Sequence, residues 1–382
     1  MFSDADSLER AVPAWEDLVQ HAIEPNPLYE PWMLLPALRA CPSADFRCVL
    51  VWTKPRTSGQ APKLGGLFPL QLVSRIRGMP IKAMKSWRHH SWLLCTPLLR
   101  KETARECLQG LLDWARADGC GASLVEFEYT PADGAFHGVL ADVLRKRDAT
   151  AVTTASFTRA LLRKRADVEN RLEAVLSGEM RKSLRRKARR LSERGALTHV
   201  VLRAGDDVQR WIDDFLLLEA SGWKGRRGSA LASTNDDRRF AAGMLAEAFT
   251  RGRLQLVGLD LDGRAIARCC NVISGEASYA YRCAYDEEFA QFSPGVMAEV
   301  ETMRHFYARP DIQLMDSLTD PDNETLNRLW KDRRTIHTVM FGVGVWGEFC
   351  ASVLPLLRWI KRCCHATRGA APGLEAKSNA AG

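Results

Sequence analysis

The sequence predicts a mixed-sheet fold of the α/β or α+β class, and three observations lead to this prediction. The 382 residues are 46% hydrophobic and 26% charged, which is typical of a globular protein with sizeable cores. Apolar runs of strand length are interspersed with longer segments of helical periodicity. Asp262-Gly263 joins two apolar runs and is a strong signal for an antiparallel hairpin. A doubly wound parallel sheet is therefore disfavoured, and the length suits two domains.

The first half of the chain reads as alternating strands and helices. Short apolar runs indicate strands, and longer segments with apolar residues at helical spacing indicate helices. The predicted strands are residues 46–52, 65–73 and 122–128, and the predicted helices are residues 103–117 and 135–144.

The second half opens with residues 167–176 and then becomes very basic. A helix is predicted over residues 179–193, where seven of the ten residues 181–190 are Lys or Arg. The further predicted helices are residues 208–218 and 236–250. The predicted strands are residues 198–203, 254–261, 264–273, 277–286, 312–315 and 335–341.

One strand–turn–helix unit stands out in this half. An aromatic-rich strand ends near Asp286, and an amphipathic helix follows Ser293-Pro294-Gly295. Ser293 is a natural N-cap, Pro294 suits the first helical position, and Gly295 lets a ligand approach the backbone. The free N–H groups of such a helix start favour a phosphate group. The alternative is that these three residues merely begin a helix. The apolar stripe of this helix is Val296, Val300, Met303 and Tyr307.

The cysteines and histidines predict no metal site and no disulfide framework. The eleven cysteines are an odd number and include no C-x-x-C pair. Reduced thiols in the cytoplasm are therefore expected. The first six residues have neither a basic nor an apolar region, and no uncharged apolar run reaches about 18 residues. We expect neither a secretory signal nor a membrane-spanning helix, and a cytoplasmic location.

Several motifs occur in an order that is known from one family. The basic helix of residues 180–195 precedes the segment 218–226, the Asp262-Gly263 hairpin, and the segment 285–289 that runs into Ser293-Pro294-Gly295. Residues 316–334 and 26–32 are similar to the closing and opening motifs of the same group. In this order the chain resembles the GNAT-superfamily N-acetyltransferases of the CelD/BcsL-type, FemAB-like group, over roughly residues 14–340.

The resemblance implies two tandem GNAT-like domains. Residues 1–155 would form the first, which shows no cofactor motif, and residues 156–345 the second, which would bind acyl-CoA. Residues 346–382 would be an amphipathic segment and a disordered tail. The usual pyrophosphate loop Q/R-x-x-G-x-G/A is absent, and the Ser-Pro-Gly turn stands in its place. FemAB-like relatives use an aminoacyl-tRNA as donor, so the resemblance leaves two possible donors, acyl-CoA and aminoacyl-tRNA.

Acyl transfer from a thioester requires that the donor be held, its carbonyl polarised and a proton removed from the acceptor. The helix start would hold the CoA pyrophosphate, and pantetheine would pair with the strand edge near residues 279–283. The predicted cofactor-binding residues are Tyr279, Arg282, Cys283, Ser293, Pro294, Gly295, Val296 and Met297.

For proton transfer the sequence leaves several candidates open, because each can equally be a solvated strand end or a packed tyrosine. These candidates are Tyr281, Tyr285, Asp286, Glu287 and Asp316. Trp223 and Lys224 suit the wall of an acceptor pocket, with plain packing as the alternative.

The basic helix has three possible roles. Its narrow apolar stripe leaves a basic face that is either solvated, or a patch for an anionic acceptor, the CoA phosphate or an anionic membrane, or an RNA-binding surface. The basic residues lack the interleaved aromatic residues of a single-strand platform, which disfavours nucleic acid. The segment 345–364 is expected to pack against the second domain, with a membrane interface as the alternative.

The sequence thus predicts an acyl-CoA-dependent acyltransferase, with acetyl-CoA as the favoured donor and no metal. The acceptor would be an amine or hydroxyl of a small molecule or glycan, and the family association suggests envelope or polysaccharide biosynthesis. The alternatives are a FemAB-like enzyme that uses aminoacyl-tRNA and a non-catalytic GNAT-like scaffold.

Overall fold

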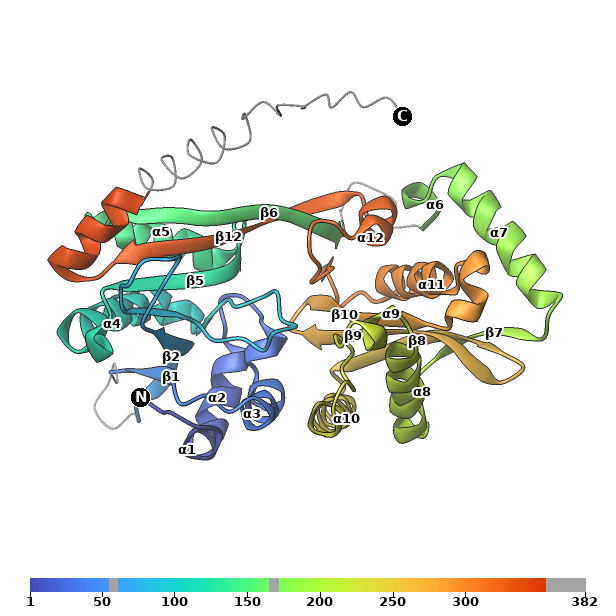
Figure 1. Cartoon of the computed structure of the whole chain (residues 1–382), viewed down its shortest axis with the longest axis horizontal. Helices are drawn as coiled ribbons and strands as arrows, with labels where there is room; N and C mark the ends of the chain where they lie inside the picture. Colours follow the sequence, from blue (N-terminus) through green and yellow to red (C-terminus); the bar gives the residue numbers. More distant parts are fainter. Residues whose placement is uncertain (55–60, 165–171, 355–382) are drawn as a thin grey trace, which may run out of the picture.

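A computed structural model describes residues 1–54, 61–164 and 172–354 (Figure 1). Over these residues one twelve-stranded sheet runs through both halves in the order β1-β2-β3-β5-β12-β6-β11-β10-β9-β8-β7, with β4 paired to β2. In the first half the strands are β1 (Phe46–Thr53), β2 (Lys63–Val73), β3 (Ala83–Ser86), β4 (Leu98–Leu99), β5 (Leu124–Pro131) and β6 (Ala151–Arg163). The later strands are β7 (Leu197–Val201), β8 (Leu254–Leu261), β9 (Arg264–Ser274), β10 (Ala277–Tyr285), β11 (Leu314–Asp316) and β12 (Asp332–Gly342).

Helices cover the sheet. Each predicted helix lies close to an observed one, but further helices, three of them before residue 41, were not predicted. The first half contains α1 (Ala5–Glu9), α2 (Val12–Gln20), α3 (Pro31–Ala40), α4 (Ala104–Ala117) and α5 (Ala135–Lys146). The second contains α6 (Leu172–Val175), α7 (Gly178–Ser192), α8 (Val208–Ser221), α9 (Trp223–Arg226), α10 (Asn235–Thr250), α11 (Pro294–Ala308) and α12 (Glu324–Leu329). The beginning of the predicted segment 167–176 lies outside the described residues.

The sheet contains both antiparallel and parallel pairs, so the predicted mixed-sheet class is confirmed. β8 and β9 form the predicted hairpin, and Asp262 and Gly263 both have positive φ, as a tight two-residue turn requires. β10 is antiparallel to β9 but parallel to β11. α11 makes the crossover between β10 and β11.

The long strand β6 joins the two halves. Its antiparallel partner β12 runs along it from Ala151 to Leu161, and β11 pairs with its last three residues. β12 also pairs with β5, so the last described strand of the chain returns to the sheet of the first half. The predicted boundary between residues 155 and 156 falls inside β6, and the division into two domains stays a prediction.

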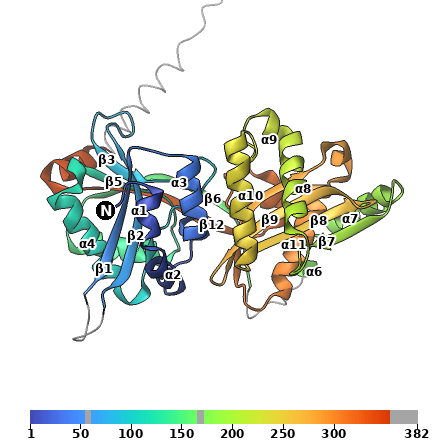
Figure 2. The same ribbon diagram turned by 90° about the horizontal axis from the view of Figure 1, so that it is seen from below.

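The two faces of the second half have different neighbours. α11 packs on one face of β8, β9 and β10, and α8 and α10 pack on the other (Figure 2). The face with α8 and α10 shares one hydrophobic cluster with α3 and Trp92 of the first half. The halves therefore meet through buried apolar side chains, which is the main stabilising term available to such a contact.

The described part of the C-terminal segment packs against the first half, so the expectation that it packs against the second is wrong for these residues. Residues 344–354 are helical, and Cys350, Ala351 and Leu354 lie among Leu124 and Met340. The physical reason is that this helix directly follows β12. Residues 355–382, which include the predicted tail, lie outside the described residues. No helix within the described ranges has the length and hydropathy needed to cross a membrane.

A buried carboxyl in the core between α11 and the sheet predicts a pH-dependent stability. Burial raises the pKa of Glu299 to about 7 from 4.5, against smaller opposing effects of the nearby Cys269 and Trp330. Because the folded pKa exceeds the unfolded one, Glu299 stabilises the fold fully below about pH 4.5, and this contribution is lost as the pH rises through about 7.

We expect the free energy of unfolding to fall by roughly 3 kcal/mol from this group across that window, at about 1.4 kcal/mol per pKa unit. Glu299→Gln should remove most of this pH dependence. Urea unfolding of both proteins at about pH 5 and about pH 8 measures it. If the free energy of unfolding changed equally between the two pH values in both proteins, the pH dependence could not be assigned to Glu299.

Candidate active site

The site is organised by the edge of β10 that faces β11. β11 pairs with β10 only from Ala277 to Tyr279, whereas β9 accompanies β10 as far as Tyr285. Residues 280–285 therefore have one edge without a partner strand among the described residues. The ladder with β9 also shifts between Ala280 and Arg282, which is a β-bulge of the kind found beside active sites.

The open edge leads to the predicted helix start. Ser293 adopts the left-handed conformation, with φ 58° and ψ 51°, and its side chain makes no capping bond to α11. Ser293 thus stands at the predicted N-cap position, but the side-chain cap is absent, and its hydroxyl instead accepts a hydrogen bond from Lys187 Nζ at 2.6 Å. The N–H groups of Gly295 and Val296 have no acceptor among the described residues. A positive helix end with free donors results, next to a cation.

Lys187 is a functional candidate that the sequence analysis missed. It belongs to α7, whose Leu184, Ala188 and Leu191 pack against Phe292 and its neighbours. Lys187 lies on this inward side and is half-buried, unlike the exposed basic residues around it. Its position between Leu184 and Leu191 on the apolar stripe is the signal that could have found it. The exposed basic residues of α7 are Arg181, Lys182, Arg185, Arg186, Arg189 and Arg190.

The predicted donor residues on β10 are divided between the two faces of the sheet. Cys283 and Tyr285 belong to the cluster on the α11 face, together with Met297. Tyr285 lies beside the turn, since a Cβ added to Gly295 would come 2.9 Å from its Cδ1 atom. Arg282 lies on the other face, where its Nη1 is 3.8 Å from Glu219 Oε1 on α8. The turn, Cys283 and Tyr285 thus come together, and Arg282 faces the opposite side.

The tyrosines have different environments. Tyr279 is buried, and its hydroxyl donates to Pro25 O at 2.8 Å, which ties β10 to the first half. Tyr281 is also buried, but its hydroxyl has no partner within the described residues. Burial raises the pKa of Tyr281 to about 12, against smaller opposing effects of Arg282 and the nearby Trp92. The hydroxyl of Tyr281 is therefore protonated near pH 7, and it is free to donate a hydrogen bond to a ligand.

Two residues of the first half lie on this side of β10 and were not singled out from the sequence: Trp92 lies beside Tyr281, and the ring of His89 packs against Trp92 and Phe240. Trp92 and His89 are buried, and both lie in the coil between β3 and β4. His89 Nε2 and Trp92 Nε1 have no hydrogen-bond partner within the described part of the chain. Burial and, next, His90 lower the pKa of His89 to about 4, so its imidazole is neutral near pH 7. No local pattern marks these residues, because only the packing of the halves brings them to β10.

The predicted acceptor residues Trp223 and Lys224 both contact the strand end. Lys224 Nζ donates to Cys283 O at 2.7 Å and lies 3.2 Å from Glu219 Oε1. The Trp223 N–H donates to Glu287 Oε1 at 2.7 Å, and its ring is partly exposed. Hydrogen bonds from Arg226 and from this N–H lower the pKa of Glu287, which makes Glu287 a poor base. The same two bonds hold α9 against the segment that follows β10. Lys224 reaches the open edge itself.

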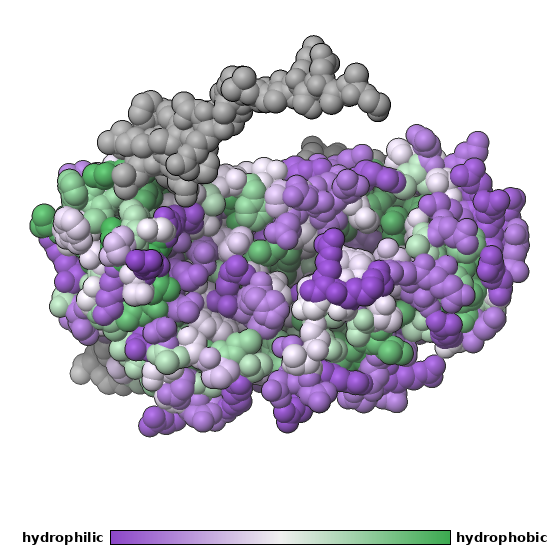
Figure 3. All heavy atoms as spheres, in the orientation of Figure 1, coloured by the Kyte–Doolittle hydropathy of each residue, from purple (hydrophilic) through white to green (hydrophobic). Residues whose placement is uncertain are grey.

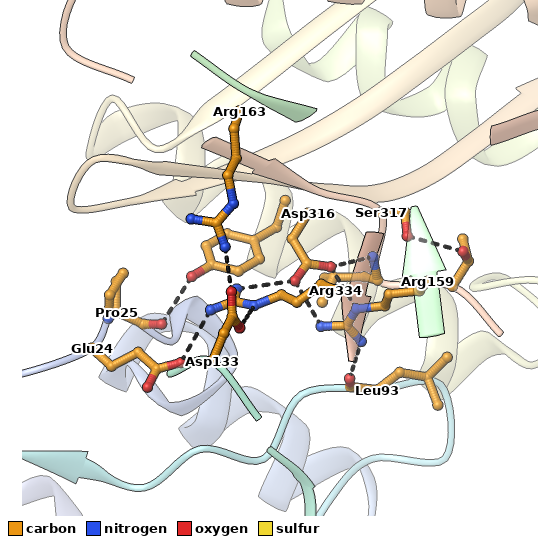
Figure 4. Close-up of polar contacts among 12 residues, drawn as sticks. Glu24, Pro25, Leu93, Asp133, Arg159, Arg163, Asp316, Ser317 and Arg334 are labelled. Atoms are coloured by element: carbon orange, nitrogen blue, oxygen red, sulfur yellow. Dashed lines mark hydrogen bonds and ion pairs between the residues drawn. The ribbon is translucent and has the colours of Figure 1, made fainter. Parts of the chain in front are cut away.

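The two predicted aspartates are held in ion pairs. Asp286 caps the 3₁₀ turn Glu287–Phe292 and pairs with Arg264. Asp316 is fully buried (Figure 4), with Oδ1 2.6 Å from Arg159 Nε and Oδ2 3.2 Å from Arg334 Nη1. Burial acts to raise the pKa of Asp316, but the two guanidinium groups outweigh it and hold the pKa below its usual value. This geometry does not favour proton transfer by Asp316.

The ion pairs of Asp316 continue into the first half as one network. Arg334 Nε lies 2.9 Å from Asp133 Oδ1, and Arg334 Nη2 lies 3.6 Å from Glu24 Oε1. Arg159 also donates to Leu93 O, on the coil that carries Trp92. The network links β11, next to the open edge, to the segments that carry the first-half residues. We infer that it positions the site.

The described residues contain no cluster of three or more His, Cys, Asp or Glu side chains that could hold a metal ion. The polar groups at the edge of β10 and at the start of α11 are instead N–H and O–H donors and cations. Such groups suit an anionic ligand with amides, such as a pantetheine diphosphate.

Comparisons with known proteins agree with this geometry. Residues 178–331 match the model of the acetyltransferase (GNAT) domain. No curated protein matches the chain. The crystal structure of FemX is similar at 12% identity, with a TM-score of 0.54, over 86% of this chain and 95% of that chain. A conserved protein of unknown function from Bacteroides thetaiotaomicron VPI-5482 is similar at 11% identity, with a TM-score of 0.54, over 87% of this chain and 97% of that chain.

The solved structures establish a likeness of fold, and the domain match covers the part of the chain that builds β10 and α11. The CelD/BcsL-type subgroup stays a prediction. Residues 178–331 are therefore similar to the acetyltransferase (GNAT) domain.

Proposed function

We propose that the protein is an acyl-CoA-dependent acyltransferase, with acetyl-CoA as the favoured donor. The observation that carries this proposal is the open edge of β10 that leads directly to the uncapped start of α11. The pantetheine amides would pair with residues 280–285 as a short strand does. The diphosphate would accept hydrogen bonds from the Gly295 and Val296 N–H groups and from Lys187.

The acceptor would approach from the face of β10 that carries Tyr281, between α8, α10 and the first half. Attack of its amine or hydroxyl on the thioester carbonyl forms the new acyl bond, and the CoA thiolate leaves with the electron pair of the broken C–S bond. The neutral His89 can take the acceptor's proton, and the protonated Tyr281 can supply one to the thiolate. A backbone N–H at the β10 bulge would polarise the carbonyl. Both halves would thus contribute side chains to the reaction.

The finer assignment follows the family resemblance. We propose a small-molecule or glycan acceptor and a role in envelope or polysaccharide biosynthesis in the cytoplasm, within the CelD/BcsL-type subgroup. The exposed basic face of α7 would attract anionic acceptors by its field.

A second candidate donor is aminoacyl-tRNA, and the exposed side of α7 favours it. The six exposed Lys and Arg side chains of this helix have no ion pair among the described residues. Figure 3 shows a strongly hydrophilic surface over the end of the molecule that carries α7. Such a surface suits a phosphate backbone. The non-catalytic scaffold is the outcome if neither donor binds.

A thermal-shift titration with acetyl-CoA tests the proposal. Binding to the folded state at about 100 times the dissociation constant adds roughly 2.7 kcal/mol, which raises the melting temperature measurably. Lys187→Met should weaken acetyl-CoA binding about 10- to 150-fold, because one charge-assisted hydrogen bond contributes roughly 1.5–3 kcal/mol.

The double variant Arg185→Met, Arg186→Met is the matched control, because it removes exposed charges from the same helix. It should leave acetyl-CoA binding unchanged. If acetyl-CoA fails to stabilise the protein and the control variant loses binding to aminoacyl-tRNA, the second candidate replaces the first.

A further inference from the structure

Two cysteines face each other across β9 and β10, beneath the start of α11. Cys269 and Cys283 are direct partners in the antiparallel register. The Cys269 thiol donates to Cys283 Sγ, and the two sulfurs are 3.0 Å apart. Both side chains belong to the cluster on the α11 face. The acyl transfer proposed above uses neither thiol, although the backbone of Cys283 belongs to the edge that would pair with pantetheine.

The pair has the geometry that a disulfide requires. Directly opposed residues of antiparallel strands have Cα atoms about 4.5–5.5 Å apart, and disulfides accept about 4.4–6.8 Å. Their sulfurs would have to close by only about 1 Å to reach a bond of about 2.05 Å. The adjacent Cys270 belongs to the cluster on the opposite face of the sheet, with α8 and α10, and cannot take part.

The two thiols also differ in accessibility. Cys283 is half-buried at the open edge of β10, whereas Cys269 is buried and lies against Glu299 and Thr302 of α11. The hydrogen bond with Cys283 and burial raise the pKa of Cys269. An oxidant can therefore reach Cys283 first, and Cys269 is placed to resolve the adduct.

We propose that Cys269 and Cys283 form a reversible thiol–disulfide site that low-molecular-weight disulfides such as glutathione disulfide oxidise. The Cys283 thiolate attacks one sulfur of glutathione disulfide, which forms a mixed disulfide and releases one glutathione thiolate. Cys269 then loses its proton, attacks the Cys283 sulfur and expels the second glutathione. The protein loses two protons and two electrons, and glutathione disulfide gains both to become two molecules of glutathione. This site does not depend on the proposed acyltransferase function.

Equilibration of the reduced full-length protein with a series of glutathione to glutathione disulfide ratios tests the proposal. Free thiols are then alkylated, and digested peptides are identified by mass spectrometry. We expect a peptide linked through Cys269 and Cys283 that disappears on reduction. Absence of this link at the most oxidising ratio, with the fold intact by circular dichroism, would overturn the proposal.

Three single variants make the result specific to this pair. Cys269→Ser should accumulate glutathione on Cys283, because the resolving thiol is gone. Cys283→Ser should carry no adduct on Cys269, because the buried thiol cannot be reached. Cys270→Ser should behave as the wild type. Equal adduct formation on Cys269 and Cys283 in the respective partner variants would contradict the assigned order of attack.

Discussion

Gly295→Trp is expected to abolish stabilisation by acetyl-CoA. Even a Cβ at this position would come 2.9 Å from Tyr285 Cδ1 and 3.7 Å from Cys283 Sγ, so an indole must project over the start of α11 or displace Tyr285. Either arrangement fills the space in front of the free Gly295 and Val296 N–H groups. We expect the dissociation constant to rise at least about 100-fold, which corresponds to roughly 2.7 kcal/mol.

Gly243→Trp is the matched control for this experiment. Gly243 is also a helical glycine of the second half, it is exposed on α10, and a Cβ there would meet no atom within 4 Å. Isothermal titration of acetyl-CoA into both variants should show binding by Gly243→Trp only. Undiminished binding by a folded Gly295→Trp variant would place the donor elsewhere.

Asp316→Asn is expected to have the largest effect on stability. Asp316 is fully buried between Arg159 and Arg334, and the substitution removes the charge while it keeps the shape. Two buried guanidinium groups then lose their shared partner. Breaking a buried ion pair in this way costs about 3–5 kcal/mol. Urea unfolding at neutral pH measures this loss.

The same substitution at an exposed ion pair serves as the control. Asp311 pairs with Arg309 on the surface, where such pairs contribute about 0–1 kcal/mol, so Asp311→Asn should unfold almost as the wild type does. If Asp316→Asn kept the wild-type stability but lost acyl transfer, Asp316 would have to be assigned to proton transfer instead.

The sequence predicted those parts of the fold that depend on local interactions. The hairpin at Asp262-Gly263 follows from turn chemistry, and the start of α11 at Pro294 follows from the ring's fixed φ. The stripes of α7 and α11 follow from helical periodicity. These signals lie within a few residues of one another, so no knowledge of distant neighbours is needed.

The roles of single side chains were harder to predict. Asp316 read as a candidate base, and only the approach of β6 and β12 shows that both of its oxygens are occupied. The sequence predicted that the Ser293 side chain caps α11. In the structure Ser293 has a left-handed backbone, and its hydroxyl accepts a hydrogen bond from Lys187 instead. His89 and Trp92 carried no signal, because Trp92 lies beside Tyr281, almost 200 residues later in the sequence, and His89 packs against Trp92 and Phe240.

By itself the sequence determined the kinds of many elements, the mixed character of the sheet and the location of the helix start at Pro294. The tertiary structure alone decided that β12 returns to the first half, that Lys187 points to the Ser293 turn and that Cys269 lies opposite Cys283. The physical reason is that strand order and side-chain partners depend on burial and pairing between distant segments. Local propensity carries no information about those pairings, because the same helix or strand can be packed against many different neighbours.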